Sequence, residues 1–287
     1  MQKINKIDLH LHVSKESIKS EQMFVSSGKE MIKHLHDLGI SKAVLMSMGD
    51  DVAFGKNFDN KELADTYPDA YAWMCNLDYK DEDTILERLT KYKSEGAIGI
   101  GELAINQRID SSFLQKVFEA AESLNLPVTF HMSPEVGYSY GIVDDPGLPL
   151  LEETLKKFPN LKLLGHSQSF WIEMSGDAPG DKEGRNSWGQ GEVKAGGRLP
   201  YLFKKYPNLY GDLSANSGGN VIMRDEKFGL AFLEKFQDRL FFATDMVNIE
   251  MEFPLGKWLD KQYENGNLSK DAYEKICYKN AERVFGL

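Results

Sequence analysis

The stretch IDLHLH at residues 7–12 alternates apolar and polar side chains, as a half-buried β-strand does. Successive side chains of a strand point to opposite faces, so Asp8, His10 and His12 are expected on one face and the three aliphatic side chains on the other. The aliphatic face suits contact with covering helices. The polar face carries two imidazoles close enough to bind one ion, and such groups are costly in a protein interior without partners. The stretch therefore predicts a strand whose polar face lines a site.

Short apolar runs alternate with segments of helical spacing along the whole chain, a pattern typical of parallel β/α units. Strands are expected at residues 4–12, 42–48, 70–76, 97–102, 127–131, 162–166, 209–212 and 240–245. The helices are expected at residues 28–38, 61–67, 84–95, 112–124, 148–158, 199–206, 227–236 and 270–285. Eight such units in 287 residues, with no Pro-, Gly- or Ser-rich linker, predict a single-domain α/β protein, a (β/α)8 TIM barrel over residues 1–287. A doubly wound open sheet is the alternative fold.

Composition narrows the class of protein. The chain is 41% hydrophobic and carries 34 basic against 44 acidic side chains, a net charge of −10, which argues against a nucleic-acid partner. No apolar run is long enough to span a membrane or act as a signal peptide, so a cytoplasmic protein is expected. Cys75 and Cys277 are too few for a disulfide framework or a cysteine metal cluster. The expected partner is a small-molecule substrate, with no membrane, and homo-oligomerisation is left open.

One connection is much longer than the others. Residues 167–198, after the sixth expected strand, hold seven glycines, two tryptophans and charges of both signs. Long loops of this kind in compact domains are usually functional. Because this loop follows a strand, it belongs to the carboxyl face of the barrel, where sites in this fold are built. We therefore predict a lid loop at residues 167–198.

Metal-competent side chains stand at the ends of four further strands, in the segments AIGIGEL, PVTFH, KLLGH and LFFATD. These side chains are Glu102, His131, His166 and Asp245. The carboxyl ends of parallel barrel strands open on one mouth, so the four groups are expected to converge there with His10 and His12. The sequence therefore predicts a metal site at the mouth of the barrel.

The types of the side chains narrow the choice of metal ion. Imidazoles and carboxylates without thiolates favour a catalytic site with open positions for Zn²⁺, with Mn²⁺ as the alternative. Such an ion lowers the pKa of water from about 15.7 to about 7. Asp245 can serve as a ligand and as the base that takes the water proton, and Thr244 is expected to orient it.

Five segments together resemble the amidohydrolase superfamily: DLHLH, GHSQSFW, YGDLSAN, FATD and NAERVFGL. Within it they look most like the amidohydrolase-2 branch of metal-dependent TIM-barrel hydrolases and decarboxylases, and the likeness extends over nearly the whole chain. The resemblance implies that His10, His12 and Asp245 bind metal, with His131 a ligand of the same or of a second ion. It also implies that His166 either pairs with His131 as a ligand or bonds the attacking water.

Glu102 departs from one pattern of the superfamily. The binuclear ureases and dihydroorotases carry a carboxylated lysine at this strand, whereas a glutamate is similar to TatD-like hydrolases, in which it bridges two metals. In a binuclear interpretation, Glu102 is shared by one ion on His10, His12 and Asp245 and a second on His131 and His166. In a mononuclear interpretation the ligands are His10, His12, His131 and Asp245, and Glu102 supports them or faces the substrate. The sequence leaves one or two ions open.

Substrate contacts are expected from loops on the same face of the barrel. A guanidinium is the natural clamp for a carboxylate or phosphate, which makes Arg185 and Arg198 in the long loop and Arg224 after the seventh strand candidates. Asn216 and Trp171 are the candidates for polar and apolar contacts.

The function expected first is metal-dependent hydrolysis of a small ester, lactone or amide, with Asp245 and His166 as catalytic residues. The alternative is a nonoxidative decarboxylase or hydratase of a carboxylated substrate. A TatD-like phosphoester hydrolase is a further alternative, which the net charge disfavours. The chain could also be a metal-binding scaffold protein without enzymatic activity. The intact set of candidate metal ligands argues against this alternative.

Overall fold

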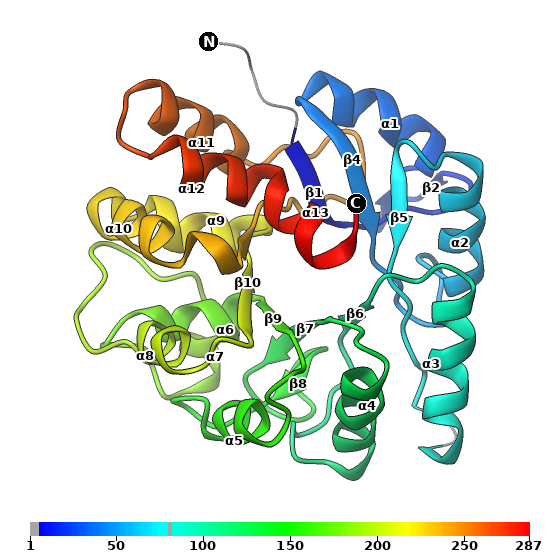
Figure 1. Ribbon diagram of the computed structural model, residues 1–287, viewed down its shortest axis with the longest axis horizontal. Helices are drawn as coiled ribbons and strands as arrows, with labels where there is room; N and C mark the ends of the chain where they lie inside the picture. The colour runs from blue at the N-terminus through cyan, green and yellow to red at the C-terminus, as the bar shows by residue number, and fades with distance from the viewer. Residues whose placement is uncertain (1–5, 80–81) are drawn as a thin grey trace.

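Short parallel strands form the centre of the molecule, and helices surround them (Figure 1). The computed structural model describes residues 6–79 and 82–287, so residues 4 and 5 of the first expected strand lie outside the described part. The barrel strands are β1 (Lys6–Leu11), β4 (Ile40–Leu45), β5 (Tyr71–Trp73), β6 (Ile100–Leu103), β7 (Val128–Ser133), β9 (Leu163–His166), β10 (Leu209–Asp212) and β11 (Leu240–Phe241). Each overlaps its expected range.

Two isolated β-bridges connect the two sets of paired strands into a closed ring. Hydrogen-bonded neighbours run in the order β1-β4-β5 and β6-β7-β9-β10-β11. Cys75 forms a parallel bridge with Ile100 between β5 and β6, and Leu11 forms one with Met246 just beyond β11. The predicted (β/α)8 barrel is therefore confirmed.

The helices that cover the barrel overlap all eight expected ranges. They are α1 (Gly28–Asp37), α2 (Asn57–Thr66), α3 (Ile85–Ser94), α4 (Ser112–Ser123), α5 (Pro149–Lys157), α8 (Arg198–Lys205), α10 (Glu226–Phe236), and a last run of α12 (Lys270–Glu274), a π-helical turn (Lys275–Lys279) and α13 (Asn280–Phe285). The first of them shows why they form here. Ser27 and Glu30 make a capping box at its start, and Met31 and Leu35 bury its apolar face.

Several further elements were not expected from the sequence. They are the β2–β3 hairpin (Ile18–Lys19 and Phe24–Val25), β8 (Ile142–Val143), α6 (Gln168–Trp171), α7 (Lys182–Arg185), α9 (Ala215–Met223), α11 (Leu255–Glu264) and 3-10 turns at Glu82–Thr84, Ile172–Met174 and Gln237–Arg239. Two of the helices and one of the turns lie inside the long loop 167–198. Within the described ranges, no helix combines the length and apolar character of a membrane span.

The predicted alternation of residues 7–12 is wrong in its first half. Ile7 and Leu9 pack with Phe241 in the cluster that fills the barrel interior, whereas Leu11 packs in the larger cluster outside it. The register between β1 and β4 shifts between Asp8 and Leu11. The side chain of Asp8 accepts a hydrogen bond from the backbone N–H of His10, and this local contact interrupts the regular pleat. The irregularity lets Leu9 fill the core while His10 still points into the barrel.

Candidate active site

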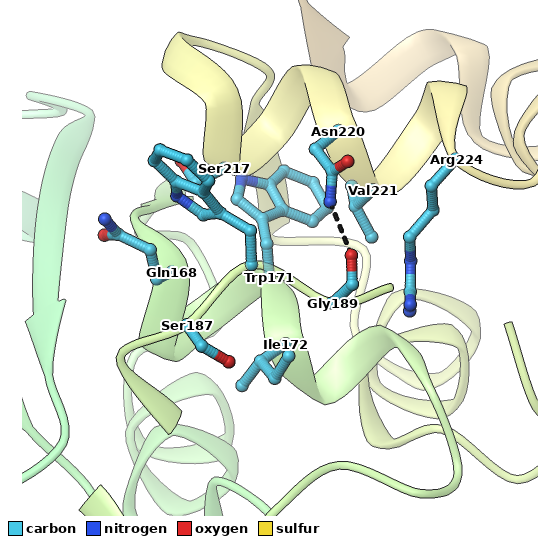
Figure 2. Close-up of a pocket in the computed structure, with 10 residues that line it drawn as sticks. Gln168, Trp171, Ile172, Ser187, Gly189, Ser217, Asn220, Val221 and Arg224 are labelled. Atoms are coloured by element: carbon cyan, nitrogen blue, oxygen red, sulfur yellow. Dashed lines mark hydrogen bonds between the residues drawn. The ribbon is translucent and has the colours of Figure 1, made fainter. Parts of the chain in front are cut away.

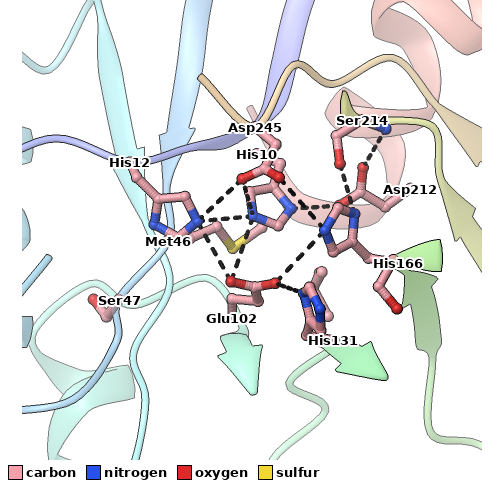
Figure 3. Close-up of polar contacts among 12 residues, drawn as sticks. His10, His12, Met46, Ser47, Glu102, His131, His166, Asp212, Ser214 and Asp245 are labelled. Atoms are coloured by element: carbon pink, nitrogen blue, oxygen red, sulfur yellow. Dashed lines mark hydrogen bonds and ion pairs between the residues drawn. The ribbon is translucent and has the colours of Figure 1, made fainter. Parts of the chain in front are cut away.

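The six side chains predicted to bind metal meet at the carboxyl ends of the barrel strands (Figure 3). They come from β1, β6, β7 and β9 and from the segments that follow β1 and β11. They are His10, His12, Glu102, His131, His166 and Asp245. The convergence predicted from strand-end positions is what the structure has.

One half of the cluster gathers ligand atoms of His10, His12 and Asp245 around a single point, with an oxygen of Glu102 beside the two imidazoles. The Nε2 atoms of His10 and His12 lie 3.0 Å apart, and Oδ1 of Asp245 lies 3.4 Å from each of them. Oε2 of Glu102 lies 3.5 Å from the Nε2 atom of His12 and 3.9 Å from that of His10. Ligands that hold one ion at about 2.1 Å in a tetrahedron lie about 3.4 Å from one another. The donor types and spacing fit one divalent transition-metal ion.

The second half of the cluster contains His131 and His166. The remaining oxygens of the Glu102 and Asp245 carboxylates lie beside these imidazoles. Oε1 of Glu102 lies 2.7 Å from Nδ1 of His131 and 3.6 Å from Nε2 of His166. Oδ2 of Asp245 lies 3.6 Å from the same Nε2 atom. Glu102 and Asp245 therefore extend across both halves.

Asp212 completes the site, and the sequence reasoning did not nominate it. Its Oδ2 lies 2.6 Å from Nδ1 of His10, and its Oδ1 accepts the backbone N–H of Ser214 at 2.9 Å. Oγ of Ser214 lies 2.8 Å from Nδ1 of His166. Both imidazoles are thus held from behind with Nε2 toward the cluster, the arrangement that orients metal-ligating histidines. Asp212 is the last residue of β10, so the strand-end rule that found the other groups would have found it too.

Burial and the neighbouring charges shift the pKa values of the side chains in the cluster. Burial lowers the pKa of His10, but the carboxylates of Asp212 and Asp245 outweigh it and raise the pKa to about 10. Burial and the neighbouring charge of His10 lower the pKa of His166 to about 4, which keeps it neutral. Burial favours the protonated forms of Glu102 and Asp245, but the imidazoles around them hold both pKa values below the usual range. Ionised carboxylates and neutral imidazoles are the forms that bind metal, so His10 would release a proton when an ion binds.

The side chain of Thr244 bonds Asp8 and not its neighbour Asp245. The hydroxyl of Thr244 donates to Oδ2 of Asp8 at 2.6 Å, and its N–H donates to Oδ1 of Asp8 at 2.9 Å, so the expectation that it orients Asp245 is wrong. Asp245 has a left-handed backbone, with φ of 61°, and donates its N–H to the carbonyl of His10 at 2.8 Å. Burial raises the pKa of Asp8 to about 7.

Two of the predicted substrate contacts, Trp171 and Arg224, line one small cavity between the long loop and α9 (Figure 2). The cavity measures about 10 Å³, close to the lower limit for one water molecule. Trp171 is buried and donates its Nε1–H to the carbonyl of Asp212 at 3.0 Å, so it supports the residue behind His10. Arg224 donates from Nη1 to the carbonyl of Gln190 at 2.8 Å.

The other predicted substrate contacts lie in the surrounding loops. Arg185 is buried and donates to the carbonyl of Pro134 at 2.9 Å, and Arg198 forms an ion pair with Glu152. Asn216 is half-buried near the start of α9. The structure does not bring these three into the histidine–carboxylate cluster, and a role in substrate binding stays a prediction.

The long loop 167–198 is tied to neighbouring loops of the carboxyl face. The side chain of Asn220, in α9, donates to the carbonyl of Gly189 at 2.8 Å, and Arg185 reaches the segment after β7. The loop has the position that the sequence indicated, and its function as a lid stays a prediction.

Comparison with known proteins places the chain in a family. A family model described as amidohydrolase, of the amidohydrolase-2 type, matches residues 7–287. The chain belongs to the amidohydrolase-2 family. No match was found among curated protein sequences. The resemblance drawn from the strand-end motifs is confirmed.

Solved structures share the fold of this amidohydrolase over its whole length. A 2,6-dihydroxybenzoate decarboxylase from Rhizobium is 16% identical with a TM-score of 0.64, and the match covers 99% of each chain. A probable 2-pyrone-4,6-dicarboxylic acid hydrolase from Acinetobacter baumannii is 16% identical with a TM-score of 0.60, covering 99% of this chain and 100% of the other. A dihydroxybenzoic acid decarboxylase from Polaromonas with bound manganese is 16% identical with a TM-score of 0.61, covering 99% and 97%. At this sequence identity the likeness shows the fold alone. The solved structures that share the fold include both hydrolases and decarboxylases by their names.

Proposed function

We propose that this amidohydrolase is a metal-dependent hydrolase of a small organic ester, lactone or amide. The observation that carries the proposal is that the two carboxylates of Glu102 and Asp245 extend across both halves of the histidine cluster. Shared carboxylates let a site hold metal on its imidazoles and still keep a carboxylate oxygen beside the water that must be deprotonated.

The donor set fits a divalent metal of the Zn²⁺ type, with Mn²⁺ as the alternative, because it combines imidazoles with carboxylates and uses no thiolate. The first ion would be held by His10, His12, Glu102 and Asp245, and a second would add His131 and His166 to Glu102. Bound there, the metal would supply the Lewis acidity that activates water and polarises the substrate carbonyl.

The protein's own groups divide the remaining work. The side chain of Asp245 is 26% exposed whereas that of Glu102 is 4% exposed, so Asp245 is the carboxylate of this pair that faces the mouth. It is proposed to take the proton of the attacking water and pass it to the leaving group. Where only the first ion is bound, His166, kept neutral by burial and by the charge of His10, is proposed to hold the water or substrate oxygen through Nε2, while Ser214 fixes its ring.

Two measurements test the proposal. Elemental analysis should find metal in the purified protein, and the His131→Ala variant should hold less of it. The metal-loaded protein should then hydrolyse members of a panel of p-nitrophenyl esters, lactones and anilides. Hydrolysis of none of them, together with release of CO₂ from carboxylated substrates, would overturn the proposal in favour of a decarboxylase.

A nonoxidative decarboxylase or hydratase is the second candidate, and one observation favours it. Aromatic rings border the cluster, with Phe54 edge-on to His12 at 6.3 Å between ring centroids and Tyr140 at 4.2 Å from His131. Such rings suit a flat, unsaturated substrate. The decarboxylases among the fold relatives are consistent with this candidate.

A further inference from the structure

The segment at residues 134–143, here called the strap, leaves β7 and returns to it. Its last two residues form β8, which pairs in parallel with Met132 and Ser133 of β7. The strap is also fastened to the loop after β6. The N–H of Gly141 donates to the carbonyl of Ala104 at 2.7 Å, and the side chain of Asn106 donates to the carbonyl of Gly141 at 3.0 Å. These bonds fix the strap beside the carboxyl ends of β6 and β7.

The strap runs directly against His131. Gly141 has φ of +116°, a conformation that residues with a side chain rarely adopt. A Cβ atom added at Gly141 would lie 2.8 Å from Cδ2 of His131 and 2.8 Å from the carbonyl carbon of Met132. Glycine at this position is therefore what allows the strap to approach the imidazole so closely.

Tyr140, the neighbour of this glycine, packs against the same imidazole. The two ring centroids are 4.2 Å apart and the rings are tilted by 42°. Tyr140 is 59% exposed whereas His131 is 7% exposed, so the phenol ring covers a face of the histidine that would otherwise be open to solvent.

His131 is held differently from the other histidines behind the cluster. His10 and His166 turn Nδ1 away from the cluster, toward Asp212 and Ser214. The ring of His131 is reversed, with Nδ1 toward Glu102 (Figure 3). Its position therefore depends on packing of the ring more than theirs does.

We propose that Tyr140 is a positioning residue, which holds the ring of His131 with Nδ1 toward Glu102 and thereby sets how tightly this half of the site binds metal. The inference rests on the proposed metal-dependent function. It predicts that the phenol ring matters for metal affinity and that the hydroxyl does not.

The test titrates Zn²⁺ alone, by calorimetry, into the metal-free full-length protein and its variants. Tyr140→Phe keeps the ring and is expected to bind Zn²⁺ within about twofold of the wild type. Tyr140→Ala is expected to weaken binding roughly two- to tenfold, the range that corresponds to the loss of one aromatic pair. Tyr138→Ala is the matched control, because Tyr138 lies on the same strap and contacts Lys182 instead of the cluster, and its affinity is expected to be unchanged.

A second readout separates positioning from general damage. In spectra of ¹⁵N-labelled histidine rings, the signal that disappears in His131→Ala should shift in Tyr140→Ala and stay in place in Tyr138→Ala. Wild-type affinity in Tyr140→Ala, or equal losses in both alanine variants, would overturn the inference alone. A wild-type protein that binds no metal would overturn the proposed function and the inference with it.

Discussion

Asp212 offers the sharpest prediction about the site, through the replacement Asp212→Asn. In the folded protein both carboxylate oxygens of Asp212 accept hydrogen bonds, one from the His10 ring and one from the backbone N–H of Ser214. An asparagine has a single carbonyl oxygen, so its amide group must face one of these two donors without accepting from it. The variant therefore either releases the His10 ring or leaves the Ser214 N–H unpaired, and it removes the negative charge in both cases.

The expected loss of metal affinity can be estimated from the hydrogen bond between Asp212 and His10. The bond between Asp212 and His10 is 2.6 Å long, both side chains are fully buried, and the acceptor is charged. Removing a partner of this kind from a metal-ligating histidine typically lowers metal affinity about 10- to 100-fold. That range corresponds to about 1.4 to 2.8 kcal/mol of binding free energy. We expect Asp212→Asn to fall within it for Zn²⁺.

The assay is competition with a chelator of known affinity, followed by thermal unfolding of the metal-free proteins to check that the barrel is intact. Asp83→Asn is the control, because that aspartate is 99% exposed and lies in a turn before α3. It should bind metal as the wild type does. If Asp212→Asn also kept wild-type affinity while remaining folded, the reasoning about the support behind His10 would be refuted.

Three further predictions concern catalysis, pH dependence and packing. Asp245→Asn is expected to keep most of the metal, because an oxygen ligand survives, and to lose nearly all turnover, which metal analysis and a rate assay together would check. Burial raises the pKa of Asp144 to about 6, so between pH 4 and 6 the folded protein holds a proton that the unfolded chain has lost, and this group makes stability fall as pH rises. In Asp144→Asn that contribution is absent, so the slope of the free energy of unfolding against pH, measured in urea across this range, should be more positive than in the wild type by at most about 1.4 kcal/mol per pH unit. An identical slope would contradict the prediction. Gly165→Ala would place a Cβ atom 2.2 Å from the buried ring of Phe170, so the free energy of unfolding should drop by about 1–3 kcal/mol or more in urea, and unchanged stability would count against this packing.

The site residues that could be predicted from the sequence are those whose position follows from the barrel fold alone. Glu102, His131, His166 and Asp245 were recognised because polar side chains ending parallel strands must meet at one mouth. The same rule covers Asp212, the last residue of β10, although only the structure shows that its partner is His10.

Contacts that depend on loops could not be predicted from the sequence. Substrate binding by Arg185 and Arg224 stays a prediction, but the sequence did not indicate that they donate to the backbone carbonyls of Pro134 and Gln190. A carbonyl is available at every residue, so nothing in the sequence indicates which one a guanidinium will reach. The predicted faces of residues 7–9 were wrong for a related reason. The side chain of Asp8 accepts a hydrogen bond from the backbone, and this contact interrupts the regular alternation of the strand.

The pairing of Asp8 with Thr244 has a consequence for how the protein reaches its native state. These two residues are 236 positions apart, and the hydrogen bonds between them join the first and last strands beside the site. Contacts of such long range are slow to form, since a large loop must close before they repay its entropy. The metal-binding half made by His10, His12 and Asp245 therefore exists only after the two ends of the chain have met. Because metal would bind this assembled state and not the open chain, it would stabilise the closed ring by an amount that grows with its affinity.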